Sequence, residues 1–323
     1  MQSSANRLGG ALTFAHLSDP HLSSLNLVRW RYLANKRLLG YLSWRRKRRF
    51  EHRHEVLQAL RQDLTKTLPD HLIITGDLTH IGLPDEFLQV RRWLESMGAP
   101  DDITIVPGNH DAYVRVAWQH SFAHWQAYMN SDNRGEDTGQ SRAGQAFPSL
   151  RIRGPVAFIG LSSAHVSAPF MATGSLGKAQ LSQLSELLDK TAQQGLFRVV
   201  LLHHPPQPGA ETWRKRLTDA PAMCEVLADC GAELVLHGHS HRYRQSKIAR
   251  PGNSVPVFGI PSASSIGPNP RRAAKYQIYK VQKVGNEWKL DMSLRAYLPH
   301  EGRFVKEQDQ SMLLPAANPT TTA

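Results

Sequence analysis

Residues able to bind a metal ion follow five separate apolar runs of this chain. One such group alone, for example "GHSH" at 238–241, is weak evidence, because a His-x-His pair in a basic protein is more often a surface or hydrogen-bonded histidine. Five unrelated turns in one chain would require the same coincidence five times. In chain order the groups are Asp19 with His21, Asp77 after Gly76, Asn109-His110-Asp111 after Gly108, His203-His204-Pro205, and His239 with His241 after Gly238.

The apolar runs have the pattern of an α/β fold. Runs such as "HLIITGD" and "FRVVLLHHP" predict buried strands, and they alternate with stretches of helical spacing such as "HEVLQALRQDLTKTL". The C-terminal third contains more strands, including "KYQIYKVQ" and "EWKLDMSLRAYL" around a "VGN" turn, which predicts two packed sheets. Ligands gather at the carboxyl ends of strands in such sheets, so the five groups are expected at one rim.

The ligand types narrow the chemistry. Imidazole and carboxylate without thiolate suit Zn, Fe or Mn and exclude an iron–sulfur or Cys-based zinc site. The set is too large for one ion and fits two ions bridged by a carboxylate, roughly 3.5–4 Å apart. Such a pair can generate hydroxide at neutral pH and hold an anionic transition state, which suits phosphoester hydrolysis.

The ordered set D-x-H, G-D, G-N-H-D, H-H-P and G-H-x-H resembles the calcineurin-like metallophosphoesterase family over residues 14 to about 265. The resemblance implies a four-layer α/β/β/α sandwich with a di-metal site at the strand C-terminal ends. It also implies a metal-dependent phosphoesterase with two divalent ions (Mn, Fe or Zn). We expect a single domain over residues 1–312 and a disordered tail over 313–323.

The resemblance also implies a role for each site residue. Asp77 would bridge the metals, His110 would face the substrate as general acid or transition-state donor, and Asp111 would orient His110. Of the next pair, His203 matches the family's ligand, and His204 could instead meet the substrate phosphate. Asp19, His21 and His241 would bind the first metal, Asn109, His203 and His239 the second, and Asn109, His110 and His204 are the expected substrate contacts.

The motifs indicate the reaction more firmly than the substrate. "GNHD" with "HHP", and "GIPSAS" after "GHSH", are similar to the branch containing class III cyclic nucleotide phosphodiesterases, which predicts a cyclic nucleotide-like diester. The alternative is a UDP-2,3-diacylglucosamine pyrophosphatase of lipid A synthesis, or another membrane-associated pyrophosphate or phosphodiester hydrolase. The commonest bacterial form of that pyrophosphatase has Arg at the position of His110. A non-catalytic scaffold is disfavoured because every expected ligand is present.

A basic insert at about 24–53 separates the D-x-H and G-D motifs. Residues 29–53 contain ten Lys or Arg and one acid, so they supply +9 of the net charge of +12. The basic residues alternate with aromatic residues and leucines, which favours a helix on an anionic membrane surface. The same composition would suit an active-site cap, a solvated face or, less well, a nucleic-acid contact.

Bulk composition adds limits on class and location. The chain is 41% hydrophobic, which predicts a globular protein, and no apolar run is long enough for a transmembrane helix or a signal peptide. We therefore expect a cytoplasmic protein, with the insert as a means of peripheral attachment to the inner membrane face. Cys224 and Cys230 are six residues apart in a predicted helix and are expected to be reduced.

Overall fold

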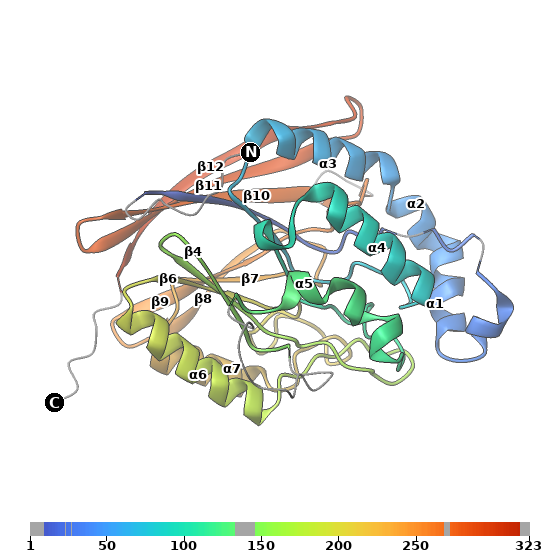
Figure 1. Ribbon diagram of the computed structural model, residues 1–323, viewed down its shortest axis with the longest axis horizontal. Coiled ribbons are helices and arrows are strands. Elements are labelled where there is room, and N and C mark those ends of the chain that lie inside the picture. The colour runs from blue at the N-terminus through green and yellow to red at the C-terminus, as the bar shows by residue number, and fades with distance from the viewer. Residues whose placement is uncertain (1–9, 23, 27, 133–145, 268–271, 317–323) are drawn as a thin grey trace.

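Two six-stranded sheets pack face to face in the computed structural model, which describes residues 10–22, 24–26, 28–132, 146–267 and 272–316 (Figure 1). The strand order is β12-β11-β10-β1-β2-β3 in the first sheet and β4-β5-β6-β7-β9-β8 in the second. The first sheet consists of β1 (Leu12–Leu17), β2 (His71–Ile74), β3 (Ile103–Ile105), β10 (Lys275–Val284), β11 (Glu287–Leu298) and β12 (Arg303–Pro315). The second consists of β4 (Ser149–Arg153), β5 (Val156–Gly160), β6 (Phe197–Leu201), β7 (Leu234–His237), β8 (Arg244–Arg250) and β9 (Asn253–Gly259).

Parallel pairing in each sheet brings the predicted site groups to one edge. β1, β2 and β3 are parallel, and so are β5, β6, β7 and β9, whereas β4, β8, β10 and β12 join as antiparallel neighbours. The candidate groups come directly after β1, β2, β3, β6 and β7, all of which are parallel strands. Their side chains therefore collect at the carboxyl edge of both sheets.

Three apolar layers hold the sandwich together. Leu60, Phe87 and Ile74 belong to the layer between the first sheet and its helices, while Phe14, Phe158 and Tyr279 belong to the layer between the sheets. A third layer joins the second sheet to its own helices. The four-layer α/β/β/α prediction is confirmed.

The helices are α3 (His54–Thr67), α4 (Pro84–Met97) and α5 (Gln126–Met129) beside the first sheet, and α6 (Lys178–Gln193) and α7 (Ala220–Cys230) beside the second. Short 3₁₀ segments occupy Pro100–Asp102, Trp118–His120 and Phe122–Trp125.

The folded chain extends past the predicted boundary at residue 312. β12 continues to Pro315 in register with β11, and Leu314 is buried in the apolar layer between the two sheets. The predicted tail therefore begins too early, and its last part, 317–323, lies outside the described residues.

Cys224 and Cys230 are both free, as expected. Among the described residues, no helix combines the length and apolar character needed to cross a bilayer.

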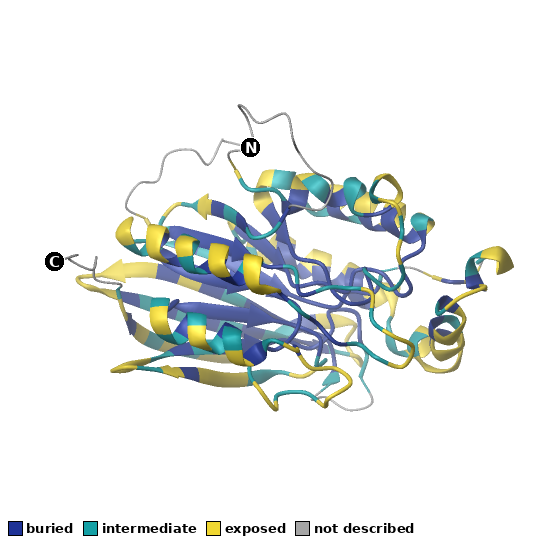
Figure 2. Ribbon diagram, turned by 90° about the horizontal axis from the view of Figure 1, so that it is seen from below, coloured by how far each residue is buried: buried dark blue, intermediate teal, exposed yellow. Residues whose placement is uncertain are grey.

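The basic insert is helical and is docked on the body of the protein. It comprises a 3₁₀ turn η1 (Trp30–Leu33), α1 (Arg37–Ser43), a π-helical turn η2 (Trp44–Arg48) and α2 (Arg49–Glu51). Leu33 and Trp44 are buried in a small apolar cluster with Ile81 and Leu83. The Arg37 guanidinium donates to the carbonyl of Ile81 at 3.0 Å. Figure 1 shows α1 and α2 at one end of the molecule, and Figure 2 shows that much of this end is exposed.

His71, at the start of β2, should make the protein less stable in acid. Its Nε2 pairs with Thr104 Oγ1 at 2.8 Å and its ring stacks on Phe158, so burial lowers its pKa well below the usual value. Below pH about 6.5 the unfolded chain gains a proton at His71 that the native chain does not, so stability falls as pH falls, approaching about 1.4 kcal/mol per pH unit.

The measurement is the free energy of unfolding in urea at pH 7, 6 and 5. We expect His71→Gln to flatten the pH dependence by about one proton equivalent. His54→Gln, an exposed substitution of the same type on α3, is the matched control, and the slope for His71→Gln is read against it. Equal slopes for wild type and His71→Gln would contradict the assignment of a neutral native His71.

Candidate metal centre

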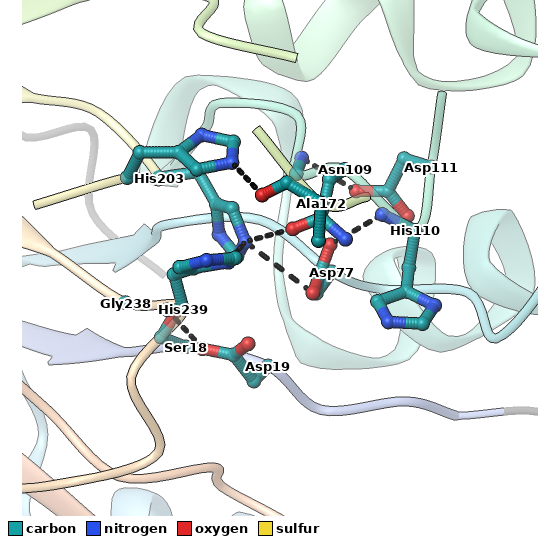
Figure 3. Close-up of polar contacts among 12 residues, drawn as sticks. Ser18, Asp19, Asp77, Asn109, His110, Asp111, Ala172, His203, Gly238 and His239 are labelled. Atoms are coloured by element: carbon teal, nitrogen blue, oxygen red, sulfur yellow. Dashed lines mark hydrogen bonds and ion pairs between the residues drawn. The ribbon is translucent and has the colours of Figure 1, made fainter. Parts of the chain in front are cut away.

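The loops after the parallel strands are joined by backbone hydrogen bonds. Asp19 donates its amide to the carbonyl of Gly76 at 3.0 Å, and Gly238 donates to the carbonyl of His203 at 3.0 Å. These bonds tie the loops after β1 and β2 together, and likewise those after β6 and β7. The side chains meet in the region drawn in Figure 3.

A first group of ligand atoms is formed by Asp19, His21 and His241. Their ligand atoms all lie within 4.8 Å of one another, and Asp19 Oδ1 is 3.0 Å from His241 Nε2. His21 Nδ1 donates to the carbonyl of Thr79 at 2.8 Å, which fixes the proton on Nδ1 and leaves a lone pair on Nε2. This is the set predicted for the first metal.

The second group is formed by Asp77, His203 and His239. His203 Nδ1 donates to the carbonyl of Thr75 at 2.7 Å, so Nε2 carries a lone pair in the neutral ring. That Nε2 atom lies 3.3 Å from Asp77 Oδ2, 3.2 Å from Asn109 Oδ1 and 3.3 Å from His239 Nδ1.

Such a cluster of buried lone pairs needs a positive charge at its centre. Although burial acts to lower it, the charge and hydrogen bond of Asp77 raise the pKa of His203 to about 9. A bound divalent ion would supply this positive charge. Histidine, carboxylate and amide oxygen ligands suit Zn, Fe or Mn. The two groups together therefore fit the two divalent ions predicted from the sequence, and Asn109 lies beside the second group, with Oδ1 3.2 Å from His203 Nε2.

Backbone strain is concentrated at the same place. Asp19, His21, Asp77, His239 and His241 all have positive φ, between 41° and 66°. Such strain costs about 1–3 kcal/mol per residue and typically persists at functional sites. Glycines also permit close approach: a Cβ atom on residue 108 would lie 2.2 Å from Asp77 Oδ1, and one on residue 238 would lie 2.5 Å from Asp19 Oδ2.

His110 projects from the loop after β3 beside both groups. Its amide donates to Asp77 Oδ1 at 2.7 Å, and its Nδ1 donates to the carbonyl of His80 at 2.5 Å. The proton on Nδ1 leaves Nε2 as the reactive nitrogen. Burial, and then the neighbouring Arg48, lower the pKa of His110 well below its usual value.

The predicted contact between Asp111 and the His110 ring is corrected by this geometry. Asp111 accepts from the amides of Gly108 and Thr79, each at 2.9 Å, so its carboxylate holds the loop rather than the imidazole. The ring is instead oriented by the carbonyl of His80. Burial and the nearby Asp77 raise the pKa of Asp111 to about 7.

The predicted substrate contact of His204 is also corrected. His204 Nδ1 pairs with Ser163 Oγ at 2.8 Å and Nε2 donates to the carbonyl of Ala172 at 3.2 Å. Both nitrogens are therefore used inside the protein, and the side chain is fully buried. Its ring lies 4.4 Å from that of His239, so His204 supports a candidate ligand.

The insert contributes residues that the sequence did not single out. Arg48 Nη1 lies 3.1 Å from His110 Nδ1, and the His52 ring centroid lies 4.5 Å from that of His21. Glu51, His52 and His241 form a third set of neighbouring ligand atoms within 4.8 Å. One feature of the sequence could have indicated Arg48. Gly40, Trp44 and Arg48 are four residues apart, which places Arg48 on the same helical face as the buried Gly40 and Trp44.

A cleft of about 660 Å³ opens above these residues. Its walls come from the insert, the loop after β3, residues 209–215 and the loop after β7. It is rich in basic residues, which favours an anionic substrate. The cations along it are Lys47, Arg48, Lys215, Arg242, Arg244 and Arg272, and the acids other than Asp77 are Glu51 and Glu211.

Comparison with known proteins identifies the family. Residues 12–243 match the model of the calcineurin-like phosphoesterases. The chain belongs to this family. It is 30% identical over 183 residues to a probable cyclic nucleotide phosphodiesterase of Synechococcus, covering 56% of this chain and 61% of the relative. A probable cyclic nucleotide phosphodiesterase of Rhodococcus erythropolis is 28% identical over 177 residues, covering 54% of this chain and 52% of the relative.

The matched parts thus span between half and about three fifths of those two relatives. Among solved structures, a dimetal phosphatase from Danio rerio aligns over 94% of this chain and 98% of its own, with a TM-score of 0.57 and 14% identity. That likeness supports the fold. The family match agrees with the sequence prediction of a metal-dependent phosphoesterase.

Proposed function

We propose that this calcineurin-like phosphoesterase hydrolyses phosphodiesters at a centre of two divalent ions. The observation that carries this proposal is the pair of ligand groups Asp19/His21/His241 and Asp77/His203/His239. Both groups reach one basic cleft, the first through His241 and the second through Asp77 and His239. When bound, the two ions would supply Lewis acidity toward the phosphoryl oxygens and an activated water nucleophile.

The residues around this centre have distinct roles in the proposal. Asp77 would hold the second metal together with His203, which lies 3.3 Å from its Oδ2, and would also serve the first metal, as the family resemblance implies; its Oδ1 accepts from the His110 amide. His110 presents Nε2 to the substrate and, when protonated there, donates to the leaving oxygen. Asp111 keeps the loop in place through the amides of Gly108 and Thr79.

Arg48 would bind the phosphoryl group from the insert side. It lines the cleft beside His110, and an arginine stays charged under all working conditions. Because Nδ1 of His110 donates to the His80 carbonyl, Arg48 does not need to donate to that ring. Its guanidinium is then available for two phosphoryl oxygens, the pairing that its fork geometry favours.

A cyclic nucleotide-like diester is the substrate that the named relatives support best. The alternative, a UDP-2,3-diacylglucosamine pyrophosphatase-type reaction, gains no support from those names. A hydrolysis panel on Mn-loaded protein separates the two, comparing bis-p-nitrophenyl phosphate, cyclic nucleotides, UDP-diacylglucosamine and a phosphomonoester. We expect the diesters to be cleaved fastest. Preference for the monoester would contradict the proposal, and preference for the UDP-sugar would move it to the alternative.

Arg48→Ala should slow hydrolysis of a small soluble diester by about 10²-fold in kcat/KM, the usual cost of losing one charged donor to the phosphoryl group. The matched control is Arg45→Ala, which removes an exposed arginine of the same turn. Metal content, measured in both variants, should not change. Equal kinetics for the two variants would remove Arg48 from the active site.

A further inference from the structure

Three segments surround the opening of the cleft and are tied to one another. Lys36 of the insert donates through Nζ to the carbonyl of Ser167 at 2.9 Å, and Ala172 donates its amide to the carbonyl of Arg214 at 2.8 Å. The insert, residues 164–172 and residues 209–216 each supply cleft-lining residues. We call the exposed side chains of residues 30–50, 164–172 and 209–216 the cleft rim.

The cleft rim has an unusual share of the exposed apolar side chains. Of the thirteen large hydrophobic residues exposed in the described part of the chain, eight lie on it, so the exposure is concentrated around the site entrance. Concentrated exposed apolar surface in a soluble fold marks an interaction site. The eight are Trp30, Leu38, Leu39, Leu42, Phe50, Val166, Phe170 and Trp213, and Trp30 and Phe170 are each 75% exposed.

The same rim is strongly basic. Its three segments contain eleven Lys or Arg, of which Arg37 is buried, and a single acid, Glu211, which accepts a hydrogen bond from Ser240. Several of the cations lie over exposed aromatic rings: Arg49 is 4.4 Å from the Phe50 ring centroid and Arg214 is 5.0 Å from that of Trp213. Aromatic and aliphatic side chains among arginines form the composition that binds an anionic lipid interface.

We propose that the cleft rim docks on the surface of an anionic lipid bilayer, with the cleft opening toward the headgroups. Charge complementarity favours this occupant, and the leucines favour it over nucleic acid, because Leu38, Leu39 and Leu42 can insert among acyl chains but cannot stack on bases. The docking is peripheral, since the rim holds short helices and loops. The proposal concerns binding and does not depend on the phosphodiesterase activity proposed above.

The basic residues at 45–49 of the insert fall into two sets by position. Arg48 and Lys47 line the cleft, whereas Arg45, Arg46 and Arg49 are exposed and do not line it. The basic insert that the sequence predicts as a membrane contact therefore presents only part of its cations outside the cleft. A docking variant must leave Lys47 and Arg48 intact.

The test is cosedimentation with vesicles of phosphatidylglycerol and phosphatidylcholine, compared with phosphatidylcholine alone, at low and high salt. One Lys or Arg near such a surface is worth about fivefold in binding, so Arg45→Gln/Arg46→Gln/Arg49→Gln should bind about 100-fold more weakly at low salt. Salt should weaken the wild type as well. Arg61→Gln/Lys66→Gln/Arg92→Gln removes the same charge from exposed positions on α3 and α4 and should bind like the wild type.

A second pair of variants tests the segments outside the insert. Phe170→Ser/Trp213→Ser should weaken binding by about tenfold, because both rings would leave the interface. Val284→Ser/Leu313→Ser removes exposed apolar side chains from β10 and β12, away from the rim, and should have no effect. Turnover of a soluble diester by Arg45→Gln/Arg46→Gln/Arg49→Gln should match the wild type, which shows that the variant is folded.

Four results would overturn the proposal. The first is wild-type binding that is absent or equal on neutral and anionic vesicles. The second is an equal loss in the rim and control variants, which would reduce the effect to net charge. The third is arginine-dependent binding of a single-stranded oligonucleotide without vesicle binding, and the fourth is a rim-dependent dimer in solution without vesicle binding.

Discussion

Replacing Asp77 with Ala should abolish turnover of every phosphoester substrate. Losing an outer-shell partner of a metal ligand typically costs 10–100-fold, so losing a ligand that serves both ions should exceed about 100-fold. The Asp77 carboxylate belongs to the second ligand group, where it lies 3.3 Å from His203 Nε2, and it accepts from the His110 amide at 2.7 Å. Metal content by elemental analysis should fall together with turnover.

Asp77→Asn is the companion variant, because it keeps an oxygen for the His110 amide and removes only the charge. We expect it to retain the fold, shown by an unchanged unfolding temperature in the presence of a chelator, yet to lose activity. Turnover of more than a few per cent of the wild type in Asp77→Ala, with two metals still bound per chain, would refute the bridging role.

The layers of the fold were predictable where strands are buried on both faces. β2 and β6 are buried along their whole length, and apart from His71 and Arg198 their residues are apolar. β8 gave no such signal, because Ile248 alone is buried in an edge strand of polar residues. β12 is similar, since most of its residues face solvent and its register comes from pairing with β11.

The position of the candidate ligands at strand ends was predictable because each group directly follows an apolar run, and their division into ligands was implied by the family resemblance. Roles that depend on distant partners were not predictable. His204 is taken out of the cleft by Ser163 and the carbonyl of Ala172, neither of which is marked in the sequence. Five consecutive cations at 45–49 likewise do not show by themselves which of them line the cleft. Arg48 lines it, and the buried Trp44 in the same turn fixes the orientation of that turn.

His110→Ala should slow turnover by about 10²–10⁴ while both metals stay bound, the usual contribution of a general acid. Metal retention is expected because the contact that His110 makes with Asp77 uses the backbone amide, which survives any substitution except proline. The side chain is held separately, through Nδ1, by the His80 carbonyl. Elemental analysis and single-turnover kinetics of the Mn-loaded variant measure the two effects independently.

The leaving group then distinguishes the two roles considered for His110. A general acid gives its proton to the departing oxygen, so its loss matters most when that oxygen is a poor leaving group. If Nε2 is the acid, His110→Ala should slow cleavage of an alkyl diester such as a cyclic nucleotide far more than cleavage of a p-nitrophenyl diester. An equal loss on both substrates would instead assign His110 to charge stabilisation of the phosphoryl oxygens, in company with Arg48. Loss of metal in His110→Ala would contradict both roles and make His110 a ligand.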